Sequence, residues 1–184
     1  MSQPDPAPAA RAALAARVHA AAHLTGRFRL RSGQVSSEYF DKYRFEADPA
    51  LLADLAAALA PLVPPDTDAL AGLELGGVPL ATAVSARTGI AARFVRKEAK
   101  PYGTENLAEG GPVEGLRLTV VEDVITSGGQ VRASCADLRE RGAEIAAVLC
   151  VVDRESGGDE ALAADGLALT PLFTASELRA AAQG

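Results

Sequence analysis

Apolar residues along the chain form two kinds of pattern, which alternate from residue 69 onward. Continuous apolar runs predict buried strands at residues 69–75, 90–96, from 118, 145–152 and 167–172. Helical spacing predicts helices at residues 10–24, 48–60, 79–87, 128–141, 159–164 and 174–182. Strands that alternate with helices predict an α/β fold with a mostly parallel central sheet flanked by helices on both faces.

The N-terminal part is less regular. Residues 1–8 are rich in proline and predict a disordered tail. Gly26 predicts the end of the first helix as its C-cap residue. Short strands are expected at residues 28–30 and 39–45, around the turn at Ser32 and Gly33.

Two later helices have clear start signals, and one segment has no periodicity. Asp48 before Pro49 predicts an N-cap and a first helical residue. Thr174 and Glu177 have the spacing of a capping box. Residues 97–115 lie between two strands and show neither helical nor strand spacing, which is typical of a functional lid.

Composition narrows the class of protein. A chain of 184 residues suits one α/β domain. The net charge of -6 and pI near 5.0 argue against nucleic acid as a partner. No uninterrupted apolar stretch reaches membrane-spanning length and no signal peptide is recognisable, so we expect a cytoplasmic protein without a membrane partner. Cys135 and Cys150 are expected to be buried free thiols, and His19 and His23 to be packing or surface residues.

Residues 118–131, LTVVEDVITSGGQV, carry the most specific chemistry. A buried strand ends in two carboxylates, Glu122 and Asp123, and two hydroxyl residues and two glycines come after them at 126–129. Glycines between a strand and a helix let backbone N–H groups converge on an anion at the helix N-terminus. Carboxylates accept hydrogen bonds from hydroxyl groups. A ligand with both a phosphate and a vicinal diol, such as a ribose 5-phosphate, satisfies the whole set.

Other interpretations of this segment explain fewer residues. A P-loop requires a lysine after its last glycine, where Gln130 stands, and the dinucleotide-binding glycine pattern is absent from this turn. An ordinary turn between a strand and a helix would account for the glycines but not for two acids and two hydroxyls beside them. Segments 74–77, 96–100, 122–129 and 153–154 are all expected at the carboxyl ends of strands, where such sheets bind ligands.

The segment resembles the phosphoribosyl-diphosphate (PRPP) binding motif of type I phosphoribosyltransferases. LRSGQVSSEYFDKYRF, RKEAKPYGTENLAEG and VVDRESGG narrow the resemblance to orotate phosphoribosyltransferases, over residues 28–158. The resemblance implies a type I phosphoribosyltransferase fold in a single domain, residues 9–184, with a small N-terminal hood at about 9–45 and a flexible catalytic lid at about 97–115. It also implies transfer of ribose 5-phosphate from PRPP to orotate in pyrimidine (UMP) biosynthesis.

The resemblance also assigns roles to residues. Asp123, Glu122 and Lys100 are expected to be catalytic, with the two carboxylates holding the ribose hydroxyls and favouring the cationic sugar of the transition state. Mg²⁺ is expected as cofactor, held mainly by the pyrophosphate of PRPP, with no protein ligand assigned. The PRPP site is expected to comprise Arg31, Arg96, Lys97, Lys100, Tyr102, Glu122, Asp123, Val124, Ile125, Thr126, Ser127, Gly128, Gly129 and Gln130. Without the resemblance, the charged residues near 96–100 would fit a solvated charged loop equally well.

Orotate carries a carboxylate on a planar ring, and a guanidinium recognises a carboxylate through two parallel hydrogen bonds. The resemblance places Arg154 at this contact and Thr126 beside it, while Tyr39 or Phe40 could stack on the ring. Alternatively, Arg154 is a surface residue paired with Asp153 or Glu155.

Two positions depart from the family. Members often have histidine where this chain has Tyr102, and a tyrosine cannot act as an imidazolium. Glu74 brings a carboxylate to where pyrophosphate should approach, either to hold Mg²⁺ indirectly or to point away. The resemblance further implies a homodimer in which the lid reaches into the neighbouring site, so that Lys100 acts in trans and Arg154 in cis. Alternative functions are a phosphoribosyltransferase for a purine or uracil, which would not need Arg154, and a non-catalytic PRPP-sensing regulator.

Overall fold

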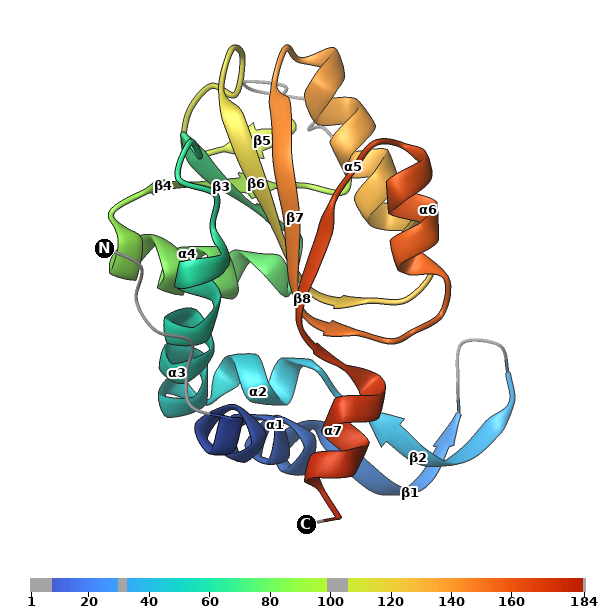
Figure 1. Cartoon of the computed structure of the whole chain (residues 1–184). Coiled ribbons are helices and arrows are strands. Elements are labelled where there is room, and N and C mark those ends of the chain that lie inside the picture. Colours follow the sequence, from blue (N-terminus) through green and yellow to red (C-terminus); the bar gives the residue numbers. More distant parts are fainter. Residues whose placement is uncertain (1–7, 30–32, 99–105, 184) are drawn as a thin grey trace.

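The computed structural model describes residues 8–29, 33–98 and 106–183, and Figure 1 shows the arrangement of its elements. The expected tail at residues 1–7 lies outside the described residues, and Pro8 is already the first residue of a helix. The elements in chain order are α1 (Pro8–Ala22), β1 (His23–Arg29), β2 (Val35–Phe40), α2 (Tyr43–Ala47), α3 (Pro49–Leu59), the 3-10 helix η1 (Ala60–Leu62), β3 (Ala69–Leu73), α4 (Gly77–Thr88), β4 (Ala91–Val95), β5 (Ala108–Glu109), β6 (Arg117–Ile125), α5 (Gly129–Glu140), β7 (Glu144–Asp153), α6 (Gly158–Ala164), β8 (Leu169–Thr174) and α7 (Ala175–Ala181).

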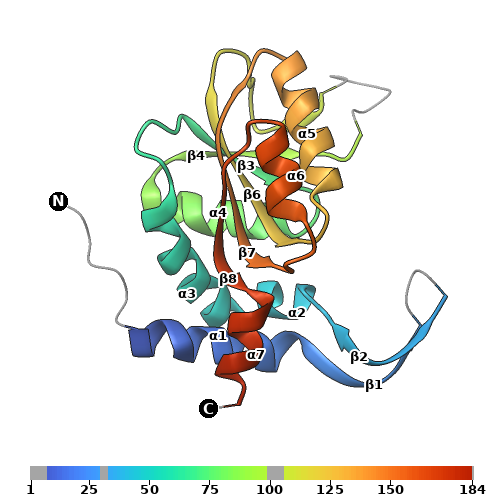
Figure 2. The same cartoon turned by 45° about the vertical axis from the view of Figure 1, so that its right-hand side comes forward.

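A six-stranded sheet forms the centre of the molecule, in the order β5-β4-β3-β6-β7-β8. Every neighbouring pair is parallel except β4 and β5. Helices cover both faces, with α3 and α4 on one side and α5 and α6 on the other (Figures 1 and 2). Side chains alternate between the two cores, since Leu70 and Val121 face the first and Ala71 and Val120 face the second. The predicted mostly parallel α/β fold is confirmed.

A smaller group of elements lies at the carboxyl end of β8, and we call α1, β1, β2 and α2, with α7 packed against them, the hood (Figure 1). The Arg11 guanidinium donates to Glu177 Oε1 at 2.6 Å and to the Leu172 carbonyl at 2.7 Å. These bonds join α1 to the C-terminal part of the chain. The β1–β2 hairpin extends away from the body in both views (Figures 1 and 2).

The N-terminal elements differ from the prediction at two places. Gly26 does not cap α1, because the helix ends at Ala22 and Gly26 lies inside β1. Antiparallel pairing of β1 with β2, which matches Leu24 with Tyr39, extends the backbone where the alanine-rich pattern favoured a helix. The single strand expected at 39–45 is also wrong, since β2 ends at Phe40 and α2 follows. The helical turn buries Phe45 completely.

The expected absence of regular structure from 97 to 115 is wrong for the second half of that range. β5 pairs with β4 at the edge of the sheet, and Leu107, Ala108 and Val113 are buried in its core. Two residues of strand are too short to give a periodic signal, which is why the sequence did not show them. Residues 99–105 lie outside the described residues.

Several local predictions are confirmed. Asp48 Oδ1 accepts hydrogen bonds from the backbone N–H groups of Ala50 and Leu51, and Pro49 is the first residue of α3. Thr174 and Glu177 form the capping box of α7. Both cysteines are free and buried.

Candidate active site

The strand order reverses between β3 and β6, which are neighbours although β4 and β5 lie between them in sequence. From β3 the sheet continues to β4, and from β6 it continues to β7. Ligands of open α/β sheets bind outside the carboxyl ends of the strands at such a reversal. The loops at residues 74–76 and 126–128 follow β3 and β6, so both flank this position.

The loop after β6 joins the strand to α5, and its backbone packs closely against the start of α6. β6 continues through Ile125, two residues beyond the carboxylates at which the strand was expected to end. Gly128 has a φ of 73°, the left-handed conformation that suits glycine, and α5 begins at the next residue. A Cβ added at Gly158 would lie 2.5 Å from the Thr126 carbonyl oxygen. The start of α6 thus holds the loop in place, with Thr126 and Ser127 exposed.

Other residues expected in this segment have different surroundings. Ile125 is buried in the core, so it can offer a ligand only its backbone, and Val124 is half-buried. The Gln130 side chain donates to Ser134 Oγ at 3.3 Å along α5. A Cβ added at Gly129 would lie 3.9 Å from Ser127 Oγ, an ordinary contact distance, so nothing crowds this position.

The two carboxylates belong to a buried polar cluster that includes two hood residues. Lys42, just before α2, places its ammonium nitrogen 2.9 Å from Asp123 Oδ1 and 2.7 Å from Asp123 Oδ2. Asp123 is completely buried, and its backbone N–H donates to Glu122 Oε1 at 2.9 Å. Glu46, on α2, is the fourth member. A Cβ at Gly76 would lie 1.8 Å from Asp123 Oδ2 and 2.6 Å from Glu46 Oε1, so only glycine lets this loop approach so closely.

Sequence reasoning missed Lys42 and Glu46. The only signal was that Lys42 falls within FDKYRF, one of the segments that carried the family resemblance. Its contact with Asp123 joins residues 81 positions apart and depends on how the hood packs on the sheet.

Charge in the cluster is shared unequally. Burial would raise the pKa of Asp123, but its hydrogen bonds with Glu122, Glu46 and Lys42 outweigh burial and lower that pKa. Burial, followed by the contacts with Asp123, raises the pKa of Glu122 well above its usual range. Burial would lower the pKa of Lys42, but its bond to Asp123 raises it. Asp123 is therefore the main negative charge, which differs from the expectation of two charged carboxylates.

Arg154 follows β7 and lies beside the loop after β6. Its backbone N–H donates to the Ile125 carbonyl at 2.9 Å, and its guanidinium carbon lies 5.4 Å from the centre of the Phe40 ring. Both side chains line a pocket of about 400 Å³ between the hood and the sheet, together with Tyr39 and Val152, and we call it the hood pocket. Thr126 does not line this pocket in the described structure, so the four residues expected at orotate are only partly brought together.

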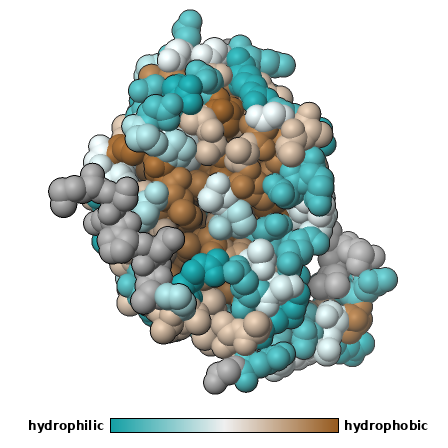
Figure 3. All heavy atoms as spheres, in the orientation of Figure 1, coloured by the Kyte–Doolittle hydropathy of each residue, from teal (hydrophilic) through white to brown (hydrophobic). Residues whose placement is uncertain are grey.

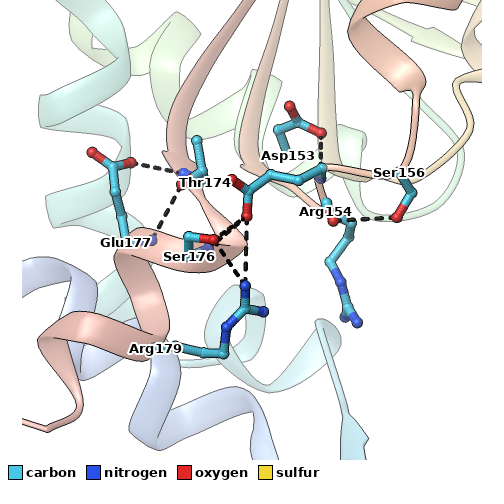
Figure 4. Close-up of polar contacts among 8 residues, drawn as sticks. Asp153, Arg154, Ser156, Thr174, Ser176, Glu177 and Arg179 are labelled. Carbon is cyan, nitrogen blue, oxygen red and sulfur yellow. Dashed lines mark hydrogen bonds and ion pairs between the residues drawn. The ribbon is translucent and has the colours of Figure 1, made fainter.

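The acidic neighbours of Arg154 have other partners (Figure 4). Asp153 Oδ1 accepts from the Glu155 backbone N–H at 2.9 Å. Glu155 Oε2 accepts from the Ser176 hydroxyl at 2.6 Å and lies 3.6 Å from Arg179. The Arg154 side chain points away from them, toward β2 (Figure 4). The alternative in which Arg154 pairs with Asp153 or Glu155 is not what the structure shows.

On the opposite side of the site, the expected lid cations are only partly described. Arg96 Nε lies 3.3 Å from Glu109 Oε1, and its backbone N–H donates to the Leu107 carbonyl. The backbone N–H of Lys97 donates to Glu74 Oε2 at 3.2 Å, so Glu74 turns toward the base of this segment. Three more expected site residues lie outside the described residues: Arg31, Lys100 and Tyr102.

The donor groups of the cluster do not offer a ready site for a resident metal ion. Asp123 already has an ammonium group against both oxygens, and no set of three metal-ligating side chains gathers among residues 8–29, 33–98 and 106–183. The residues do fit a magnesium ion that arrives on a diphosphate, because Mg²⁺ commonly keeps waters and substrate phosphates as ligands.

Comparisons with known proteins show what this chain is similar to. Residues 44–167 match the family model described as phosphoribosyl transferase domain. An orotate phosphoribosyltransferase from Nocardioides sp. is 55% identical over 170 residues, which cover 92% of this chain and 95% of the relative.

The chain is also similar to solved structures of orotate phosphoribosyltransferases. The orotate phosphoribosyltransferase of Mycobacterium tuberculosis in complex with Fe(III) dicitrate superimposes with a TM-score of 0.84 and 34% identity, over 92% of this chain and 98% of that one. Its complex with PRPP gives 0.79 and 31%, over 92% and 99%. Among the described residues, no helix is both long and apolar enough to cross a membrane.

Proposed function

Because the chain belongs to the phosphoribosyl transferase domain family and, within it, to the orotate phosphoribosyltransferases, we propose that the groups described above form one active site. The reaction of this family transfers the ribose 5-phosphate group of PRPP to orotate, giving orotidine 5′-phosphate and pyrophosphate in pyrimidine biosynthesis. The assignments of individual residues, of Mg²⁺ and of a dimer are our proposals.

The loop after β6 binds the ribose 5-phosphate part of PRPP. Backbone N–H groups of residues 126–129 and the N-terminus of α5 receive the phosphate, where the helix dipole favours negative charge. Asp123 and Glu122 take the ribose hydroxyls. As the bond from C1 to pyrophosphate breaks, positive charge develops on the sugar, and the charge of Asp123 stabilises it.

Arg154 binds the carboxylate of orotate and Phe40 packs on the ring. The observation that carries this assignment is the hydrogen bond from the Arg154 backbone to the Ile125 carbonyl, which fixes the arginine beside the PRPP loop. A guanidinium directed into a pocket without an acidic partner among the described residues suits a carboxylate ligand. Thr126 and Tyr39 complete the base site when ligand is bound.

Pyrophosphate leaves on the other side, toward the cations near the end of β4. We assign Arg96, Lys97, Lys100, Tyr102 and Arg31 to this part of PRPP, with the Arg96–Glu109 contact replaced by the ligand. Mg²⁺ bound to the diphosphate supplies additional positive charge against the leaving group. Removal of divalent cations with EDTA should abolish pyrophosphate release, and added Mg²⁺ should restore it.

A panel of bases tests the base assignment. The protein is incubated with PRPP, Mg²⁺ and either orotate, uracil, adenine or hypoxanthine, and pyrophosphate release is measured. Only orotate should react, since uracil lacks the carboxylate and a purine does not fit the same contacts. Equal rates with uracil and orotate would remove the assignment of Arg154.

We also propose a homodimer in which the lid of one subunit completes the neighbouring site. The N–H of Arg96 donates to the Leu107 carbonyl at 2.9 Å, so these two residues, which flank the expected lid, lie side by side at the edge of the sheet. Apolar residues gather over the middle of the face in Figure 3, as at an interface between subunits. We place the enzyme in the cytoplasm.

Mixing two inactive variants tests this arrangement. Lys100→Ala and Arg154→Ala are combined under conditions of subunit exchange, and random pairing makes about half of the dimers mixed. If Lys100 acts in trans, each mixed dimer has one intact site, and activity should recover to roughly a quarter of wild type. No recovery despite demonstrated exchange would place Lys100 in the site of its own subunit.

A further inference from the structure

Two buried carboxyl groups from distant parts of the chain face each other beside Gly76. Glu46 on α2 is 7% exposed and Asp123 on β6 is 0% exposed. Glu46 Oε1 has no hydrogen-bond donor among the described residues, and the contact recorded for Asp123 Oδ2 is the Lys42 ammonium at 2.7 Å. Both oxygens lie against the same glycine, within 2.6 Å of its Cβ position.

Two ionised carboxylates in this position would repel each other without water to screen them. The cluster would then hold three negative charges, on Glu46, Glu122 and Asp123, against the single positive charge of Lys42. One shared proton resolves the conflict, because a protonated carboxyl group is a hydrogen-bond donor and its neighbour remains an acceptor. Carboxyl pairs in proteins commonly ionise in two separated steps for this reason.

We propose that Glu46 is a positioning residue of the PRPP site, a neutral carboxylic acid whose hydroxyl donates to Asp123 and fixes the orientation of that carboxylate toward the ribose. Lys42 neutralises Asp123 from the same side. The two hood residues, together with the Val124 backbone N–H that donates to Oδ1, thus hold the Asp123 carboxylate in a fixed orientation. The inference rests on the proposed function in one respect, the assignment of Asp123 to the ribose.

The ionisation of Glu46 agrees with this geometry. Burial, followed by the contacts with Asp123, raises the pKa of Glu46 to about 9. The charged groups that face it are Asp123 and Lys42, with Asp41 at its own end of the hood, and Glu122 is part of the same cluster. Lys42 alone among these opposes the increase in the pKa of Glu46, because its positive charge favours the ionised acid.

Three variants separate the role of the proton from that of packing. Glu46→Gln keeps shape and supplies an amide N–H donor that does not titrate, and Glu46→Leu keeps volume but removes the donor. Glu140→Gln, at the exposed end of α5, is the matched control. We expect Glu46→Gln to stay within a few-fold of wild type in kcat/KM for PRPP at neutral pH, and Glu46→Leu to lose about tenfold to a hundredfold, the range of a hydrogen bond to a charged group.

The pH profile provides a measurement that a purely structural role would not change. In wild type, kcat/KM for PRPP should fall as Glu46 ionises near pH 9. Glu46→Gln should move this basic limb to higher pH, while Glu140→Gln leaves it in place. If the limb is unchanged in Glu46→Gln, or if glutamine is as harmful as leucine in a folded protein, the proposal is wrong.

A direct observation of the proton does not depend on activity. In protein labelled with ¹³C at glutamate side chains, the signal that disappears in Glu46→Gln should keep the chemical shift of a protonated carboxyl at neutral pH. A signal at the ionised position would overturn the inference, whatever the kinetics. Conversely, full activity of Asp123→Asn alongside a protonated Glu46 would overturn the assignment of Asp123 to the ribose and leave the shared proton intact.

Discussion

The two halves of the site are built in opposite ways. On the proposed ribose side, Asp123 and Glu122 are buried, the charge of Asp123 is balanced by Lys42, and the loop after β6 is packed against α6. On the base side, Arg154 is exposed at the edge of an open pocket, and Tyr39 is 44% exposed. Under the proposed assignments, the positive charge that develops on the ribose is met by a preorganised group, whereas the base is met by side chains that can adjust.

The largest effect should come from removing the charge on the preorganised side. Asp123→Asn should lower kcat by on the order of a hundredfold, as for loss of one preorganised electrostatic contact, while the protein remains folded. Steady-state kinetics and circular dichroism measure both quantities. Asp137→Asn on α5 is the control. Activity within twofold of wild type would show that the buried cluster is not the ribose site.

A smaller effect is expected on the adjustable side. Arg154→Lys keeps the positive charge but loses the planar fork, so orotate affinity should fall by about tenfold, the value of one charge-assisted hydrogen bond. PRPP affinity should change little. Calorimetric titration with each substrate distinguishes the two, with Arg141→Lys as control. An equal loss of affinity for orotate and for PRPP would mean that Arg154 does not act on the base side alone.

The last effect is a slope of stability against pH rather than a change at one pH, and it again distinguishes the buried half. Glu46 has its pKa raised from 4.5 to about 9 on folding, so the folded protein keeps a proton that the unfolded chain loses between these values. The stabilising contribution is complete below the lower value and is lost as pH rises through the upper one. The free energy of unfolding should therefore fall by at most about 1.4 kcal/mol per pH unit from this group.

Urea unfolding across this pH interval tests the slope. Glu46→Gln has no proton to lose at this position and should show a shallower dependence than wild type, whereas Glu140→Gln should show the same one. Identical slopes in all three proteins would mean that Glu46 is ionised in the folded state.

The sequence predicted the parts of the site that depend on neighbouring residues. The strand, the acidic pair and the glycine loop of residues 118–131 are local, as are the N-cap of Asp48 and the capping box of α7. Lys42 and Glu46 could not be found in this way, because their contact with Asp123 depends on the packing of α2 against β6.

The errors in the predicted elements have the same origin. The alanine-rich pattern favoured a helix through Leu24, but the hydrogen bonds of the β1–β2 hairpin outweigh that preference. β5 exists only because β4 offers it an edge to pair with. In each case a partner distant in sequence decides the local structure.

The pairing of β6 with β7 also fixes the distance between the ends of these two strands. Ile125 is opposite Asp153, and the next residue, Arg154, returns a hydrogen bond to the Ile125 carbonyl. Parallel strands lie about 4.8 Å apart, so the backbone fixes the distance between the loop that we assign to the ribose and the residue that we assign to the base. Because the backbone sets this distance, side chains near Arg154 can be replaced without changing it. Under the proposed assignments, a few substitutions near Arg154 could therefore change the base preference without changing the geometry at the ribose.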